Sequence, residues 1–177
     1  SEDSKGIKEA QDELIAAGGG RNVVAGLIAI IDEKENRVRK PASVYAAMTV
    51  LGEMRAIEAV DVLVGHIGFP HVYEGEPMPI FGGMGMMHDG LKGIERAYPA
   101  VRPLIQIGEP CIGEVLRKLS RSDQRGERMA CLGVLLGLRD QPLVVEMLKE
   151  AIENESDSIK RDRLQRGLNR LVRDIDY

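Results

Sequence analysis

The sequence predicts an all-α protein built from helical hairpins stacked in a row. The first observation is that an apolar residue is followed by others three, four and seven positions later at four places in the chain. This spacing keeps one stripe of a 3.6-residue helix apolar. The sets recur at offsets of 36, 52 and 32 residues, which indicates repeated helical units. They are Val24/Leu27/Ile28/Ile31, Val60/Leu63/Val64/Ile67, Ile112/Val115/Leu116/Leu119 and Val144/Met147/Leu148/Ala151.

Composition is the second observation. A chain of 177 residues with 44% hydrophobic content is long enough to bury one core, so we expect a single domain over residues 1–177. Aromatic residues make up only 3% and Trp is absent, which favours close helix packing over a sandwich or barrel. The net charge of −4 argues against a general binder of nucleic acid or acidic membranes. No apolar run approaches the roughly 20 residues that span a bilayer, so we expect a soluble protein.

The helices can be assigned in order along the chain. An opening pair is expected at 4–18 and 21–34, and a second pair lies within 42–67. In this second pair, Pro41 fits a helix start and Gly52 ends or tightens the first helix. The third pair, the fourth pair and a last capping helix are expected at 90–107 with 110–120, 123–138 with 141–153, and 156–174. Pro99 and Pro103 remove backbone donors, so the first helix of the third pair should be kinked or split near residues 98–99.

The second pair resembles a known family of helical repeats. The stretch 46–54, AAMTVLGEM, and the stretch 58–63, EAVDVL, are similar to HEAT repeats, especially the short bacterial kind found in phycobilisome-lyase-like proteins. The resemblance covers about residues 20–153 and implies a HEAT/ARM-like solenoid, an α-α superhelix of about four hairpins plus a C-terminal capping helix. It further implies that second helices line the inner surface, which makes Asp61, Val62 and His66 candidate binding residues.

The segment 68–90 interrupts the repeat and differs from the rest in composition. It holds six Gly, three Pro, three of the six aromatic residues, four of the eight Met and two of the three His. Long irregular insertions are often functional, and Met with aromatic side chains forms an adaptable apolar surface. The alternative is that its apolar residues fold back over one edge of the stack. The candidate binding residues here are Phe69, His71, Tyr73, Phe81, Met84, Met86, Met87 and His88.

Chemical sites are weakly indicated. The three His, with nearby Met and Asp89, suggest soft metal ligands, but no His-x-x-x-His or paired Cys fixes a geometry, so we expect no metal. No nucleophile elbow or phosphate loop is present, and we expect neither an enzyme nor a cofactor. Cys111 and Cys131 lack CxxC spacing, which favours buried thiols over a disulfide.

The expected function is a non-enzymatic scaffold that binds a protein or peptide partner, because such repeats specify a surface more than a reaction. The family resemblance leaves open a lyase-like or chaperone-like role toward a tetrapyrrole. A nucleic-acid-binding role would rest on one face of the last helix, although acidic residues interrupt it and a solvated capping face is the preferred interpretation. That face comprises Arg163, Arg166, Arg170 and Arg173. The chain begins without Met, which leaves a cytoplasmic location by default or an exported mature domain.

Overall fold

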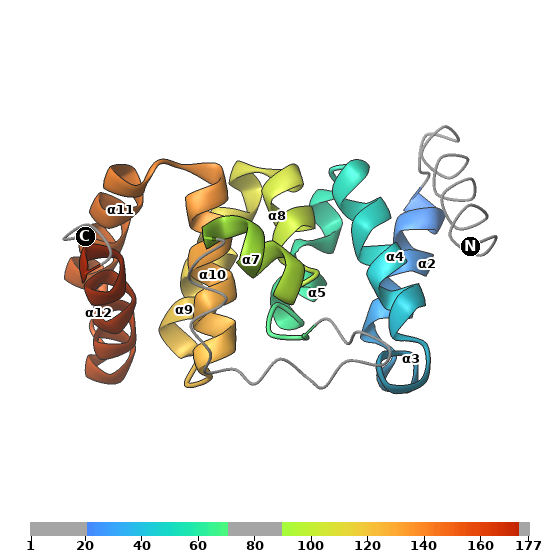
Figure 1. The fold of residues 1–177 in the computed structure, drawn as a ribbon, viewed down its shortest axis with the longest axis horizontal. Coiled ribbons are helices and arrows are strands. Elements are labelled where there is room, and N and C mark those ends of the chain that lie inside the picture. The colour runs from blue at the N-terminus through green and yellow to red at the C-terminus, as the bar shows by residue number, and fades with distance from the viewer. Residues whose placement is uncertain (1–20, 71–89, 174–177) are drawn as a thin grey trace.

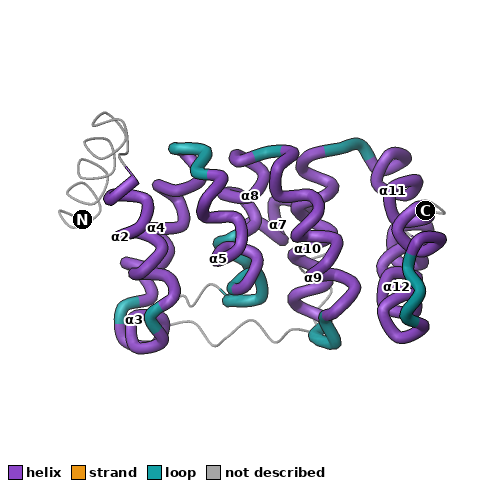
Figure 2. The backbone as a smooth tube through the Cα atoms, turned by 180° about the vertical axis from the view of Figure 1, so that it is seen from behind, coloured by secondary structure: helices purple, strands orange, loops and turns teal. Residues whose placement is uncertain are grey.

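The computed structural model describes residues 21–70 and 90–173, and every regular element in these two ranges is helical. The helices follow one another along the long axis of the molecule, from α2 to the pair α11 and α12 (Figure 1). The connecting loops gather along two opposite edges of this row (Figure 2). The prediction of an all-α protein is confirmed over the described residues.

Most helices lie where the apolar stripes placed them. The expected helix 4–18 lies outside the described residues. The α-helices are α2 (Arg21–Asp32), α3 (Lys34–Arg39), α4 (Pro41–Glu53), α5 (Val60–Gly65), α7 (Gly90–Ala97), α8 (Val101–Ile107), α9 (Ile112–Arg121), α10 (Arg125–Leu138), α11 (Gln141–Asn154) and α12 (Ser158–Arg173). Two short 3-10 helices, η1 (Ile57–Ala59) and η2 (Glu109–Cys111), precede α5 and α9.

Proline sets two of these boundaries. Pro41 occupies the first turn of α4, where a missing backbone N–H costs no helical hydrogen bond. Between α7 and α8 the chain turns over residues 98–100, with Pro99 at the centre. The kink or split predicted near residues 98–99 is observed as a break between two helices. Pro103 lies in the first turn of α8, so it is tolerated there.

The expected helix 21–34 is shorter than predicted and is followed by the unpredicted α3. The side chain of Arg37 on α3 donates hydrogen bonds to the backbone carbonyls of Ile31 at 2.8 Å and Asp32 at 2.6 Å. These carbonyls belong to the last residues of α2, so they have no backbone N–H partner within the helix. Arg37 therefore provides hydrogen-bond donors for the last carbonyls of α2 and fixes the corner between α2 and α3.

The helices pack in two rows around one core. The first row is α4, α8 and α10, in which α8 packs on both neighbours. On the other side, α5 packs against α9, and α2 packs chiefly on α4. Residues from all four apolar stripes belong to, or pack against, a single hydrophobic cluster that extends from Val24 to Leu171. The stripes therefore face a shared interior, as predicted.

The C-terminal helices pair differently from the prediction. Helix α11 packs mainly against α12 and only lightly on α10, while α12 lies against α9. A Cβ on Gly167 of α12 would lie 3.6 Å from Leu119 on α9 and 3.7 Å from Leu132 on α10, which is ordinary van der Waals contact. The expected pairing of 123–138 with 141–153 is thus replaced by a pairing of α11 with α12. Leu143, at the start of α11, is 51% exposed.

Within the described residues, no helix combines the length and the hydropathy needed to cross a bilayer.

Candidate binding groove and the predicted site residues

The structure places four of the predicted binding residues at or just after α5. Asp61 is exposed, Val62 is half-buried and packs on the core, and His66 is half-buried where α5 ends. Phe69 follows three residues after His66 and also packs on the core. The other seven lie outside the described residues: His71, Tyr73, Phe81, Met84, Met86, Met87 and His88.

His66 joins α5 to the corner formed by α2 and α3. Its Nε2 lies 3.3 Å from Asp32 Oδ1 and 3.3 Å from Arg37 Nη1. A neutral ring with a bare Nε2 accepts from Arg37, whereas a protonated Nε2 donates to Asp32. In either state the imidazole bridges parts of the fold. The side chain that the sequence offered as a binding residue is therefore already engaged by the protein's own groups.

Phe69 has a structural role as well. Its ring contacts that of Tyr45 on α4, with 5.7 Å between centroids and 43° between planes. The Tyr45 hydroxyl donates a 3.1 Å hydrogen bond to the carbonyl of Pro70. These two contacts hold residues 69–70 against α4. The position of Phe69 agrees with the second interpretation of segment 68–90, in which its apolar residues fold back over one edge of the helix stack.

A cavity lined by described residues lies elsewhere, between α4 and the corner of α7 and α8. It is open to solvent and has a volume of about 230 Å³. We call it the α4–α8 groove and define it by its lining residues: Tyr45, Thr49, Glu95, Arg96, Pro99, Arg102, Pro103 and Gln106. None of these was a candidate from sequence. Two of them, Pro99 and Pro103, could have indicated this site from the sequence. They predicted the break between α7 and α8, and the bend at this break forms one wall of the groove.

Close contact between α4 and α8 forms the base of the groove. A Cβ on Gly52 would lie only 2.5 Å from Pro103 Cα, which is too close for any side chain. Gly52 therefore lets the two backbones meet at this crossing. Pro103 is buried there, and Pro99 is half-buried nearby. Both rings are rigid and apolar, so they present a fixed surface to whatever enters the groove.

Polar groups surround this apolar base. Thr49 is exposed, and its hydroxyl donates to the Tyr45 carbonyl at 2.9 Å. Gln106 and Glu95 are half-buried, while Arg96 and Arg102 are exposed. Arg96 has a further interaction, whereas Arg102 makes no hydrogen bond or ion pair with any described residue. An apolar base, an amide and a guanidinium are groups that can hold a short segment of polypeptide.

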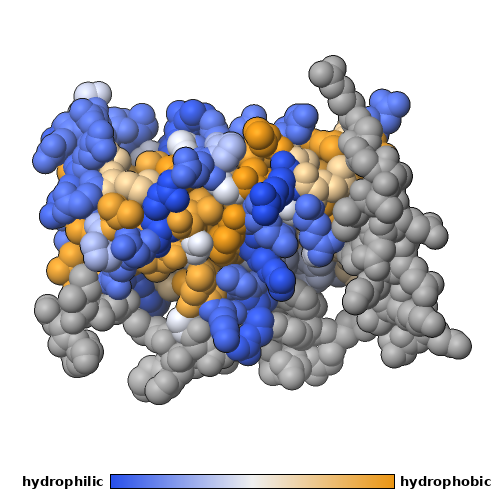
Figure 3. Space-filling model, turned by 90° about the horizontal axis from the view of Figure 1, so that it is seen from above, coloured by the Kyte–Doolittle hydropathy of each residue, from blue (hydrophilic) through white to orange (hydrophobic). Residues whose placement is uncertain are grey.

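Apolar side chains elsewhere are more dispersed. Seen from above, hydrophobic residues are interrupted by hydrophilic ones (Figure 3). The large apolar residues that are exposed are spread over four elements: Val38, Ile57, Leu143, Ile159 and Val172. The α4–α8 groove is therefore a better-defined candidate than any flat apolar surface.

The two cysteines are buried, free thiols, as predicted. Burial raises the pKa of Cys111 to about 11 and that of Cys131 to about 12. Cys111 also donates through Sγ to the Leu104 carbonyl at 3.5 Å. Because the thiolate is the reactive form, neither sulfur is prepared for nucleophilic chemistry near neutral pH. In the described ranges, no three His, Cys, Asp or Glu side chains are grouped as metal ligands.

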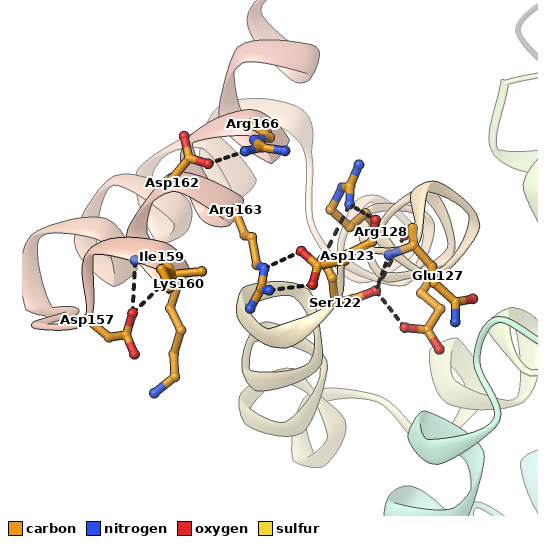
Figure 4. Close-up of polar contacts among 11 residues, drawn as sticks. Ser122, Asp123, Glu127, Arg128, Asp157, Ile159, Lys160, Asp162, Arg163 and Arg166 are labelled. Atoms are coloured by element: carbon orange, nitrogen blue, oxygen red, sulfur yellow. Dashed lines mark hydrogen bonds and ion pairs between the residues drawn. The ribbon is translucent and has the colours of Figure 1, made fainter.

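The arginine face of the last helix is partly neutralised (Figure 4). Arg163 forms a fork to Asp123, with Nε to Oδ1 at 2.8 Å and Nη2 to Oδ2 at 2.5 Å. Arg166 is paired with Asp162 on the same helix. The pairing of these two arginines leaves less free positive charge than the sequence pattern indicates. It gives α12 a structural contact with the loop between α9 and α10.

No protein-family model, no curated protein and no solved structure matches this chain.

Proposed function

We propose that this chain is a non-enzymatic, HEAT-like interaction scaffold and that its α4–α8 groove receives a segment of a protein partner. The sequence repeat and the two packed rows of helices support the HEAT-like interpretation, since first helices pack on first helices and α5 on α9. The observation that carries the functional proposal is the groove itself. It combines a rigid proline base with polar groups along its rim.

The size of the groove favours a peptide segment over an enclosed small molecule. Its volume of about 230 Å³ lies below the roughly 300–1,000 Å³ of common ligand pockets. A few residues of an extended chain fit such an open site and continue beyond it. Thr49, Gln106 and Arg102 provide hydrogen-bonding groups for a partner's backbone and side chains.

The test is selection of short peptides from a displayed library on the purified protein. The affinity of enriched peptides is then measured by fluorescence anisotropy. Thr49→Arg places a long side chain across the groove at an exposed helical position, and it should weaken binding by about tenfold or more. Asn154→Arg is the matched control, because it makes the same charge change at an exposed position on α11.

Unchanged binding to the Asn154→Arg protein and loss of binding to the Thr49→Arg protein would support the proposal. Equal binding to both variants, or a library that yields no enriched peptide, would contradict it. Circular dichroism of each variant establishes that the helical fold is intact.

A further inference from the structure

We infer that the α4–α8 groove is selective for acidic segments, and that Arg102 binds a carboxylate of the partner. This inference rests on the proposed function and names the chemistry of the segment that the groove receives. Arg102 is exposed, borders the groove, and makes no ion pair or hydrogen bond with any described residue. Its planar guanidinium presents a fork of N–H donors that matches the two oxygens of a carboxylate.

The charge of the groove is opposite to that of the whole chain. Two arginines and one glutamate line it, so the lining carries a net charge of +1, whereas the full chain carries −4. The local charge of the groove therefore favours an acidic segment, although the chain as a whole is negatively charged. Such attraction acts over about 8 Å at physiological salt, so it affects only the part of a partner that lies close to Arg102.

The apolar base adds a second requirement. Pro99 and Pro103 offer rigid rings beside Arg102, so a residue next to the bound carboxylate should be apolar or aromatic. Nucleic acid fits this site less well, because its affinity depends on several neighbouring phosphate contacts. Only two cationic side chains line the groove, and Arg96 already has an interaction of its own. A polypeptide with one or two carboxylates matches the number of groups available.

The test uses two matched libraries of short, fluorescein-labelled peptides. One includes Asp and Glu at the randomised positions, and the other has Asn and Gln in their place. Both are screened against wild type, Arg102→Glu, Arg102→Lys and the control Arg121→Glu. Arg121 is exposed on α9 and does not line the groove, so its reversal matches the change in net charge. Binding of the best acidic peptides should weaken by about tenfold or more in Arg102→Glu and by less in Arg102→Lys.

Binding to the Arg121→Glu protein should stay within about twofold of wild type, since only long-range charge is altered. The amide peptides should bind more weakly and should not respond to Arg102→Glu. If enriched peptides lose affinity on Thr49→Arg but contain no excess of acidic residues, or bind Arg102→Glu as well as wild type, this inference is wrong and the proposed function stands. If no peptide binds, both are wrong.

Discussion

Gly52 shows how one missing Cβ positions two helices and the groove between them. The sequence marked this residue as one that ends or tightens a helix; it is the second-last residue of α4 and lies at the crossing with α8. We expect Gly52→Ala to destabilise the protein by ~1–3 kcal/mol, because the new Cβ meets the Pro103 backbone. The matched control is Gly113→Ala, since no atom lies within 4 Å of a Cβ at that helical position.

Gly113→Ala should leave stability unchanged or raise it by up to ~1 kcal/mol through helix propensity. Urea unfolding followed by circular dichroism measures both variants. Equal effects of the two substitutions would show that α4 and α8 are not in close contact at Gly52. The role of Gly52 could not be read from the sequence, because it depends on a neighbour from another part of the chain.

The buried thiols give a second prediction at the residue scale, concerning pH. Burial raises the pKa of Cys131 from 9.0 to about 12, so the folded state holds its proton more tightly than the unfolded state. The resulting stabilisation is fully present below about pH 9 and is lost as pH rises toward the folded value. We therefore expect the free energy of unfolding to fall between pH 9 and 10.5 in urea titrations at constant ionic strength.

Cys131→Ala is the control, because it removes the titrating group at the cost of a small cavity. Its unfolding free energy should decline less over the same pH interval. In addition, a thiol reagent at pH 7.5 should modify wild type only as fast as the protein opens. Rapid labelling of both cysteines in the native protein would contradict their burial.

At the scale of elements, Asp157 is expected to hold the start of α12. Its Oδ1 accepts hydrogen bonds from the backbone N–H groups of Ile159 at 2.9 Å and Lys160 at 3.2 Å, which is the geometry of an N-cap. These bonds lower the pKa of the Asp157 carboxyl. The stabilisation is therefore present above the unfolded carboxyl pKa and is lost as pH falls through the lower folded value.

We expect Asp157→Ala to reduce the unfolding free energy at pH 7, and the difference from wild type to shrink as pH approaches 3. Asp157→Asn keeps an oxygen acceptor and should retain most of the stability at pH 7. Denaturant unfolding at a series of pH values measures all three proteins. A pH-independent difference between wild type and the alanine variant would mean that the carboxylate does not cap α12.

The sequence predicts the bounds of a helix well where they depend on residues that are close together in the chain. The apolar stripes place α4 and α11 to within one residue, and Pro99 accounts for the break between α7 and α8. It does not predict α3, because this six-residue helix buries no side chain and so has no stripe. The pairing of α11 with α12, in place of α10, could not be read from the apolar stripes either, because a stripe does not identify the helix that covers it.

The candidate site was harder to predict than the helices. Of the residues proposed from sequence, His66 and Phe69 are engaged by the protein's own side chains. The groove instead combines Tyr45 and Thr49 on α4 with Arg102 on α8, and these meet only after the first-row helices pack. Periodicity reports which face of each helix is buried. It carries no information about which exposed residues of two helices become neighbours.

For the whole molecule, packing in rows predicts that stability is distributed unevenly along the chain. Helix α3 has no buried residue, and α11 has two, Val144 and Leu148. The central helices bury six residues each: Val44, Ala47, Met48, Val50, Leu51 and Gly52 in α4, and Ala130, Cys131, Leu132, Gly133, Val134 and Leu135 in α10. Hydrogen exchange under native conditions should therefore be slowest in α4 and α10 and faster in α3 and α11.

The same packing determines how far along the chain a single substitution destabilises the helices. Since each unit of a stacked array contacts chiefly its neighbours, Gly52→Ala should accelerate exchange in α4 and α8 more than in α11 and α12. Gly113→Ala should leave this ranking unchanged. Mass spectrometry of peptides from each helix provides the comparison. A uniform acceleration along the whole chain would show instead that the helices unfold as one cooperative unit, and it would count against the proposed HEAT-like array.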